Sequence, residues 1–315
     1  MTKIDIVSGF LGSGKTTFIK KLLEENIVQE KVVIVENEFG KVGIDGSLLQ
    51  ETGIDIVEIN SGCICCTLVG EFSRAIELVI KTYQPDRVII EPSGVGKLSE
   101  VLSSCTEFTS QDHIKLNGIV TIVDVVKYET NLEYVTEYFE DQIRNANTIF
   151  LSRTQKATVE EVQYIVEDIK RINKNANIVT TPWDQLESKG VLTLLENKVG
   201  AFMEEQEKVC TDPHCNHHNH SHKENEFFER WEIETSQPYT KGDIEYCLKA
   251  LSDTDYGMVL RAKGILPTTE GDWIQFDFVP GEYEIRDISP DYTGRLCVIG
   301  KALNKGKVER LFACK

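Results

Sequence analysis

The chain has 315 residues, 41% of them hydrophobic, and a formal net charge of −17 at pH 7 from 51 acidic and 34 basic residues. This length suffices for about two domains that each bury a core. The acidic excess argues against a nucleic-acid partner, because phosphate backbones call for a basic protein face.

Neither a membrane span nor an export signal is predicted. No run approaches the ~20 apolar residues of a spanning helix. The first residues lack the basic region and small-residue cleavage site of a signal peptide. We therefore expect a cytoplasmic protein that binds no membrane. Its nine cysteines are then expected to be thiols or metal ligands rather than disulfides.

Roughly the first 200 residues alternate apolar, strand-like runs with helix-like stretches, which predicts a parallel α/β sheet flanked by helices. Most of these strands are continuous apolar runs, as expected of strands covered on both faces. The clearest helix spans about 158–174, where Thr158 and Glu161 form a capping-box pattern. The predicted strands are Lys3–Ser8, Val32–Glu36, Asp55–Ile59, Arg87–Glu91, Gly118–Asp124, Thr148–Leu151 and Asn177–Thr180.

Composition changes at about 203–226, a segment without apolar periodicity that we interpret as a mobile linker. The sequence thus predicts an α/β domain over 1–202, the linker over 203–226 and a smaller α+β domain over 227–315. In that smaller domain, strands are predicted near 227–235, 256–264, 273–279 and 295–300, and helices near 241–251 and 304–312.

A phosphate-binding motif lies near the start of the chain. Gly9-Phe-Leu-Gly-Ser-Gly14-Lys15-Thr16 fits G-x-x-x-x-G-K-[ST], follows an apolar strand and opens a helical pattern. Its glycines let the backbone N–H groups point inward around phosphate oxygens at a helix N-terminus. Lys15 would reach the β- and γ-phosphates, and the Thr16 hydroxyl would bind Mg²⁺. The fold expected is that of a P-loop nucleoside triphosphatase.

A P-loop also needs a carboxylate for the Mg²⁺ ion or its waters. Glu91 ends the apolar run Val88-Ile-Ile, and Gly94 follows three residues later, where its N–H could meet a γ-phosphate and move when that phosphate leaves. We assign Glu91 a catalytic role together with Lys15. Asp45 and Glu36 lie in the segment that a nucleotide switch would occupy, and Asp45 is assigned to Mg²⁺.

Three cysteines follow the third predicted strand. Asn60-Ser-Gly-Cys63-Ile-Cys65-Cys66 places three thiols within four residues, and three thiolates can converge on one soft or borderline metal ion. Zn²⁺ is favoured, with Co²⁺ or Cu⁺ as alternatives. We assign Glu36 as a further ligand of this ion.

The second cluster of metal-binding residues lies in the predicted linker. Its irregular spacing does not match one fixed tetrahedral site and favours a capture tract that samples several ligand sets. Its members are Cys210, His214, Cys215, His217, His218, His220 and His222.

The order of these motifs resembles the CobW-like metallochaperone GTPases, relatives of the nickel-insertion GTPases of hydrogenase and urease maturation. The resemblance rests on the P-loop, Glu36-Asn-Glu-Phe-Gly40, the Cys-x-Cys-Cys motif, Glu91-Pro-Ser-Gly94 and a C-terminal domain containing Val-Leu-Arg-Ala-Lys-Gly at 259–264. It implies a GTPase whose nucleotide state controls metal binding at Cys63, Cys65 and Cys66, with delivery to a client metalloprotein. The residues assigned to nucleotide are Gly9, Gly12, Ser13, Gly14, Lys15, Thr16, Thr17, Gly94, Arg153 and Gln155.

One stretch departs from the family pattern. Where relatives carry Asn-Lys-x-Asp for guanine, this chain reads Ser152-Arg153-Thr154-Gln155. Gln155 can accept only through a neutral amide oxygen, so it should discriminate against adenine less strongly than a carboxylate. Arg153 could still stack on the base.

The leading hypothesis is therefore a GTP-hydrolysing metal chaperone that uses GTP, Mg²⁺ and Zn²⁺ or Co²⁺. Two alternatives remain open at this point. One is a metal-storage protein with a purely structural nucleotide domain, which the histidine tract favours. The other is a P-loop ATPase or kinase in a cofactor pathway such as that of corrinoids, which the altered base stretch permits.

Overall fold

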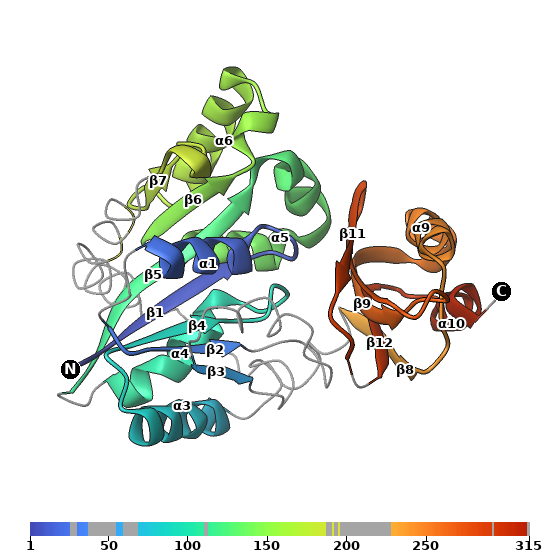
Figure 1. The fold of residues 1–315 in the computed structure, drawn as a ribbon. Coiled ribbons are helices and arrows are strands. Elements are labelled where there is room, and N and C mark those ends of the chain that lie inside the picture. Colours follow the sequence, from blue (N-terminus) through green and yellow to red (C-terminus); the bar gives the residue numbers. More distant parts are fainter. Residues whose placement is uncertain are drawn as a thin grey trace. The chain divides into compact units, whose positions relative to one another are not determined.

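The computed structural model describes residues 1–25, 30–36, 55–58, 69–109, 113–186, 191, 195, 228–291 and 293–313. These residues form two units, one within residues 1–218 and the other within 219–315 (Figure 1). Among the helices described, none has the length and apolar character needed to cross a membrane. The predicted linker, 203–226, lies outside the described residues.

The first unit contains a seven-stranded sheet in the order β3-β2-β4-β1-β5-β6-β7, with every neighbouring pair parallel. This confirms the predicted parallel sheet. Its central strands are almost wholly buried, which explains the apolar runs Val32–Val35 of β2 and Val88–Ile90 of β4. The strands are β1 (Thr2–Gly9), β2 (Val32–Glu36), β3 (Asp55–Glu58), β4 (Arg87–Glu91), β5 (Ile114–Asp124), β6 (Thr148–Ser152) and β7 (Asn177–Val179).

Helices cover both faces of this sheet. Phe18, Ile19 and Leu22 of α1 form one core cluster with apolar side chains of β1, β2, β4, β5 and β6. On β5, Thr121 alternates with Val120 and Ile122 of that cluster and donates its hydroxyl to α5, which therefore lies on the opposite face. Helix α3 neighbours α4, α4 neighbours α5, and α5 neighbours α6. The helices are α1 (Lys15–Glu25), α3 (Val69–Tyr83), α4 (Leu98–Thr109), α5 (Tyr128–Arg144) and α6 (Val159–Ile172).

The helix predicted over 158–174 is present as α6. Thr158 is its N-cap, and both hydrogen bonds of the capping box with Glu161 are formed. Strand β5 begins at Ile114, four residues before the predicted start at Gly118. The prediction missed these residues because polar Lys115 and Asn117 interrupt the apolar run. Asn117 is nevertheless buried, with its amide donating 2.7 Å to Asp5.

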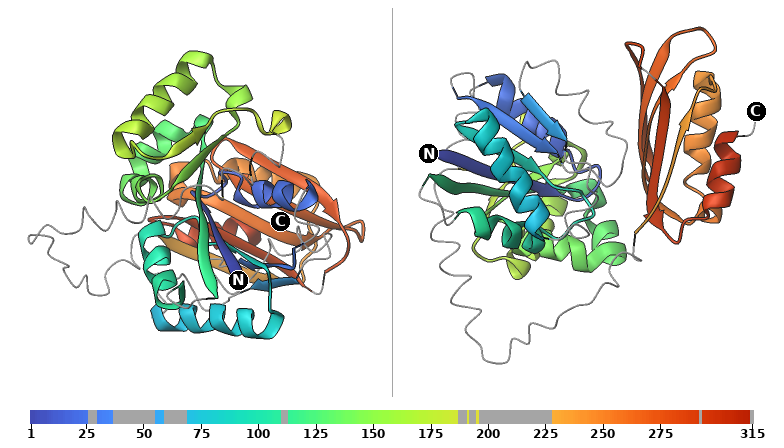
Figure 2. Two further views of the ribbon diagram at one scale, coloured as in Figure 1. Left: turned by 90° about the vertical axis from the view of Figure 1, so that its left-hand side faces the viewer. Right: turned by 90° about the horizontal axis from the view of Figure 1, so that it is seen from below.

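The second unit is a five-stranded antiparallel sheet in the order β11-β10-β9-β12-β8. Helices α9 (Lys241–Ala250) and α10 (Lys305–Ala313) pack on one face of it, as the right-hand view of Figure 2 shows. Phe276 of the sheet and Phe312 of α10 stack in the core between the sheet and the helices, with ring centroids 6.4 Å apart. The strands are β8 (Glu229–Thr235), β9 (Met258–Pro267), β10 (Trp273–Val279), β11 (Glu282–Ile288) and β12 (Gly294–Lys301).

No strand is predicted from the sequence at the position of β11. Four of its seven residues, Glu282-Tyr-Glu-Ile-Arg-Asp-Ile, are charged, and it is an edge strand, so it needs no continuous apolar run. It pairs with β10 through a hairpin whose turn includes Gly281 at φ +82°. The α+β character of this unit is as predicted.

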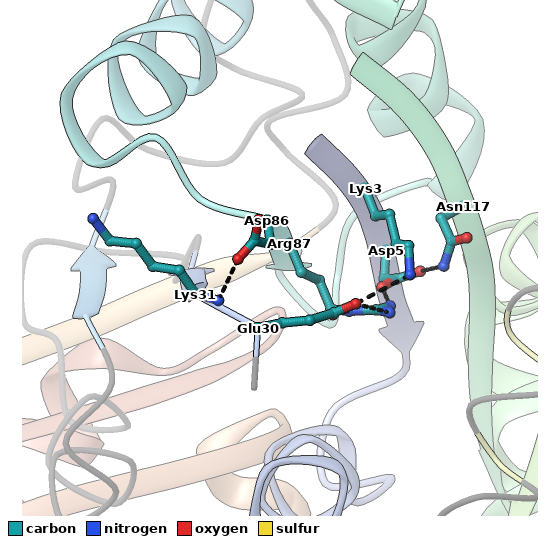
Figure 3. A network of polar contacts seen from close by, with 7 residues as sticks. All are labelled: Lys3, Asp5, Glu30, Lys31, Asp86, Arg87 and Asn117. Carbon is teal, nitrogen blue, oxygen red and sulfur yellow. Dashed lines mark hydrogen bonds and ion pairs between the residues drawn. The ribbon is translucent and has the colours of Figure 1, made fainter. Parts of the chain in front are cut away.

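A buried ion network fastens the amino ends of the strands in the first unit (Figure 3). Arg87, only 2% exposed at the start of β4, pairs with Asp5 of β1 and donates to Glu30 just before β2, with 2.5 Å between Nε and the carboxylate. Lys3 adds a 3.1 Å ion pair to Glu30. The network thus links β1, β4 and the residue before β2 at the amino ends of these strands. Parallel sheets of this kind bind their ligands at the other edge, beyond the carboxyl ends of the strands.

Candidate nucleotide and metal site

The loop between β1 and α1 has the conformation that a phosphate nest requires. Gly9, Gly12 and Gly14 have φ of +145°, +71° and +103°, a region that other residues adopt only at a cost. At Gly9 a Cβ atom would also lie 2.5 Å from the Ile122 carbonyl oxygen. The glycines of the motif are thus needed for the loop to reverse and enter α1 at Lys15.

Two polar side chains of the loop are buried. Lys15 is 5% exposed and donates to the Phe10 carbonyl oxygen at 3.4 Å, so its ammonium lies against the loop itself. Ser13 is 3% exposed. The cationic head and the backbone N–H groups of this loop suit an anion of the size of a phosphate.

Thr16 and Glu91 are brought together from distant parts of the sequence. The Thr16 hydroxyl lies 3.1 and 3.3 Å from the two carboxylate oxygens of Glu91, which is 9% exposed at the end of β4. A hydroxyl beside a carboxylate is the oxygen-rich arrangement that Mg²⁺ favours next to a phosphate loop. The donor chemistry of the pair therefore fits the ion predicted from sequence.

Glu36 lies next to Glu91. The two residues are partners in the register of β2 and β4, and Glu36 is 3% exposed. The predicted thiolate ligands Cys63, Cys65 and Cys66 and the predicted Mg²⁺ ligand Asp45 lie outside the described residues. So do all seven members of the histidine and cysteine tract. The described residues themselves contain no cluster of three or more metal-ligating side chains.

The segment after Glu91 packs directly on the phosphate loop. A Cβ atom at Gly94 would lie 2.9 Å from the backbone nitrogen of Leu11 and 2.9 Å from its side chain. Only glycine lets the two segments approach this closely without movement. The proximity that the sequence predicted between Gly94 and the phosphates is compatible with this packing.

The stretch predicted to face the base is attached to the same loop. The Ser152 hydroxyl, at the end of β6, donates 2.7 Å to the Ser13 carbonyl oxygen. Arg153 has a left-handed backbone (φ +58°) and its guanidinium pairs with Asp124 at 2.9 Å. Gln155 is exposed in the short helix Thr154–Lys156. In this stretch Ser152 is hydrogen-bonded to the phosphate loop, Arg153 is ion-paired with Asp124, and the Gln155 side chain is exposed to solvent.

Two residues of this region were not identified from the sequence. Trp183 donates its indole N–H to the Leu151 carbonyl oxygen at 3.0 Å, and its ring meets that of Phe18 edge-on, with the ring centroids 5.6 Å apart. A Cβ atom at Gly14 would lie 3.2 Å from the Trp183 ring. Asp124 is 3% exposed and anchors Arg153. The available signals were a tryptophan in a polar stretch and a carboxylate ending an apolar strand.

Comparisons with known proteins agree with this arrangement. Residues 3–180 match the family described as CobW/HypB/UreG, nucleotide-binding domain, and residues 228–315 match the cobalamin synthesis protein cobW C-terminal domain. The zinc chaperone YeiR of Escherichia coli (strain K12) is 35% identical over 163 residues, covering 52% of this chain and 50% of YeiR. The chain thus matches about half the length of YeiR.

Two further relatives match over longer regions. The zinc chaperone YjiA of Escherichia coli (strain K12) is 28% identical over 270 residues, covering 84% of this chain and 81% of YjiA. The zinc-regulated GTPase metalloprotein activator 1 of Schizosaccharomyces pombe (strain 972 / ATCC 24843) is 24% identical over 318 residues, covering 91% of this chain and 77% of that relative. The nucleotide-binding domain of the family alone matches more than half of the residues of this chain. The chain therefore belongs to the CobW/HypB/UreG family.

Proposed function

We propose that this protein is a GTP-hydrolysing metallochaperone, which binds a transition metal in a nucleotide-dependent way and delivers it to a client metalloprotein. The observation that carries the proposal is the contact of Thr16 with Glu91 beside the phosphate loop. It joins a P-loop hydroxyl to a strand-end carboxylate, and a purely structural domain has no need of that pair.

In this proposal the loop from Gly9 to Thr17 holds the phosphates. Lys15 neutralises charge on the β- and γ-phosphates, while Thr16 and Glu91, with Asp45, hold Mg²⁺ directly or through its waters. When bound, Mg²⁺ supplies charge neutralisation at the phosphate oxygens. Gly94 meets the terminal phosphate because its segment lies against Leu11.

The transported metal is assigned to Cys63, Cys65 and Cys66 with Glu36. Zinc is our first choice because three relatives carry zinc in their names; cobalt suits the same thiolate and carboxylate donors. Glu36 neighbours Glu91 in the sheet register, so a shift of Glu91 on loss of the γ-phosphate would reach the metal site through one strand pair. The histidine and cysteine tract over 210–222 would collect metal, and a reducing compartment such as the cytoplasm would keep the thiols available.

The test is a metal titration of the full chain with Mg²⁺ and GTP, with GDP, or with no nucleotide. We expect Zn²⁺ affinity to differ at least tenfold between the GTP and GDP states, which corresponds to about 1.4 kcal/mol of coupling. The triple variant Cys63→Ser, Cys65→Ser, Cys66→Ser should lose that difference.

The matched control is Cys105→Ala. This thiol is fully buried in α4, and burial raises its pKa to about 12, so it stays protonated and is a poor metal ligand. Unchanged metal affinity in the triple variant with GTP bound would refute the proposal. Equal metal affinity of the wild-type chain in all nucleotide states would instead support a storage protein.

A second candidate, use of ATP, is favoured by the base stretch. Gln155 is neutral, and the Arg153 guanidinium is held by Asp124. Side-by-side turnover of GTP and ATP decides between the two. Faster ATP hydrolysis that does not respond to added metal would point to an ATPase or kinase.

A further inference from the structure

Gln142, near the end of α5, lies behind the segment that follows Glu91. Its side chain is fully buried, at 0% exposure. The amide nitrogen donates to two backbone carbonyl oxygens, those of Gly94 at 3.2 Å and Gly96 at 2.9 Å. A helix residue thereby holds a loop through both hydrogens of one amide group.

The helix end that carries Gln142 is itself fixed. The main-chain carbonyl of Gln142 is one of the last four of α5, which have no partner within the helix. The hydroxyl of Thr121 on β5 donates to it at 2.7 Å. Because both acceptors of the side chain are carbonyls, the amide must present its NH₂ group to them, which fixes its orientation. Gln142 is thus a rigid support rather than a flexible contact.

Hydrogen bonds within and onto the turn over residues 93–96 orient the peptide groups on both sides of Gly94. The Gly94 carbonyl is held by Gln142, and the Ser93 carbonyl accepts from the Gly96 N–H at 3.0 Å. In a trans peptide the N–H points opposite to the preceding carbonyl. The Gly94 N–H therefore points away from the turn over 93–96, with its Cα packed against Leu11 of the phosphate loop.

We propose that Gln142 is a positioning residue that holds the Gly94 N–H in place for the terminal phosphate of the nucleotide. The inference rests on the proposed function, since it needs a nucleoside triphosphate on the loop. Gln142 does not touch the nucleotide. It acts through Gly94, and so it should set the preference for a triphosphate over a diphosphate without contributing to the grip on the α- and β-phosphates.

The experiment compares Gln142→Met with the wild-type chain in the presence of Mg²⁺. Methionine keeps the length of the side chain and removes both donors. The affinities for GDP and for a slowly hydrolysed GTP analogue are measured by calorimetry. Losing two hydrogen bonds should weaken analogue binding about tenfold, while GDP binding stays within about twofold. Equal weakening of both nucleotides, or of neither, would overturn the proposal.

Asn173→Leu is the matched control. Asn173 is another buried side-chain amide, and its nitrogen donates to the carbonyls of Ile143 and Arg144 in the last turn of α5 and of Ala146 just after it, not to the segment after Glu91. This variant should lower the melting temperature without changing the ratio of analogue to GDP affinity. If it changes the ratio as Gln142→Met does, general loosening of α5 explains the effect and the proposal is wrong.

Gln142→Glu supplies a second test that keeps size and polarity. Burial beside two carbonyl oxygens keeps its carboxyl group protonated, so it can donate one hydrogen where the amide donates two. We therefore expect a selective loss smaller than in Gln142→Met; a loss equal for GDP and the analogue would contradict a positioning role. Failure of the wild-type chain to bind any guanine nucleotide would refute the proposed function itself. Normal wild-type binding with an unaffected Gln142→Met variant would refute only the inference about Gln142.

Discussion

Thr16 and Glu91 form the contact on which the nucleotide site depends: the hydroxyl on the second residue of α1 lies 3.1 and 3.3 Å from the two carboxylate oxygens that end β4. Seventy-five residues separate them in the sequence. The sheet brings them together because β4 is the direct neighbour of β1, whose end leads into α1.

Thr16→Ala should weaken Mg²⁺ binding in the GTP complex. Loss of a group that supports a metal site from its outer shell typically lowers metal affinity roughly 10- to 100-fold, and we expect at least that effect here, with hydrolysis falling in parallel at limiting Mg²⁺. The Mg²⁺ dependence of GTP turnover measures this. Thr158→Ala, at the N-cap of α6, serves as the control: it should cost about 1 kcal/mol of stability and leave the Mg²⁺ curve unchanged.

Gln155→Asp should increase the preference for GTP over ATP about tenfold, because a charged acceptor binds the N–H groups of guanine more strongly than a neutral amide. Competition between the two nucleotides in a binding assay gives the ratio directly. The exposed neighbour Lys156 provides the control through Lys156→Ala. An unaltered ratio in Gln155→Asp would place base recognition elsewhere.

Trp183 should report nucleotide binding through its fluorescence, because its ring lies against Gly14 of the phosphate loop. Adding GDP should shift the emission of the wild-type chain, and Trp183→Phe should abolish that shift while retaining the edge contact with Phe18. The other two tryptophans, Trp231 and Trp273, belong to the second unit. Trp231→Phe should therefore keep the fluorescence response to GDP. Loss of the response in that variant would show that the signal comes from the second unit and would contradict the prediction.

Arg87→Met should destabilise the first unit by about 3–5 kcal/mol, since it leaves the buried carboxyl group of Asp5 without its ion-pair partner. Urea unfolding followed by circular dichroism measures the change. The double variant Asp5→Asn, Arg87→Met should recover part of the loss. A double variant as unstable as the sum of the two single variants would show that the pair is not coupled.

Glu30→Gln should flatten the loss of stability in acid. Burial alone would raise the pKa of Glu30, but hydrogen bonds from Arg87 and Lys3 outweigh it and lower the pKa below its ordinary value of 4.5. A carboxyl with a lowered folded pKa adds stability above 4.5 and loses it as the pH falls through the folded value. The free energy of unfolding of the wild type should therefore drop more steeply below pH 4.5 than that of the variant. Identical pH profiles would contradict this assignment.

The local parts of the fold and site could be predicted from the sequence. Most of the parallel strands are read from continuous apolar runs, and the phosphate loop from glycines spaced around Lys15. The capping box of α6 involves residues only three apart. Each of these features is determined by neighbours in the chain.

The long-range features could not be predicted. Ser152 meets Ser13 across 139 residues, and Gln142 meets Gly94 across 48, so no spacing in the sequence indicates either contact. Trp183 and Asp124 acquire their roles only when the ends of β5 and β6 meet the loop after β1. Strand β11 escaped prediction because an edge strand can be largely charged.

The position of β1 also constrains how the polypeptide acquires its shape during synthesis. This strand lies between β4 and β5, both of which are made much later. At about 5–20 residues per second, a ribosome needs roughly 5–25 s to proceed from β1 to the end of β5. During that interval β1, which is almost wholly buried in the finished sheet, has neither neighbour, so its Ile4, Ile6 and Val7 side chains are open to chaperones or to aggregation. Nucleotide present in the cell can then stabilise the chain only after the centre of the sheet has closed.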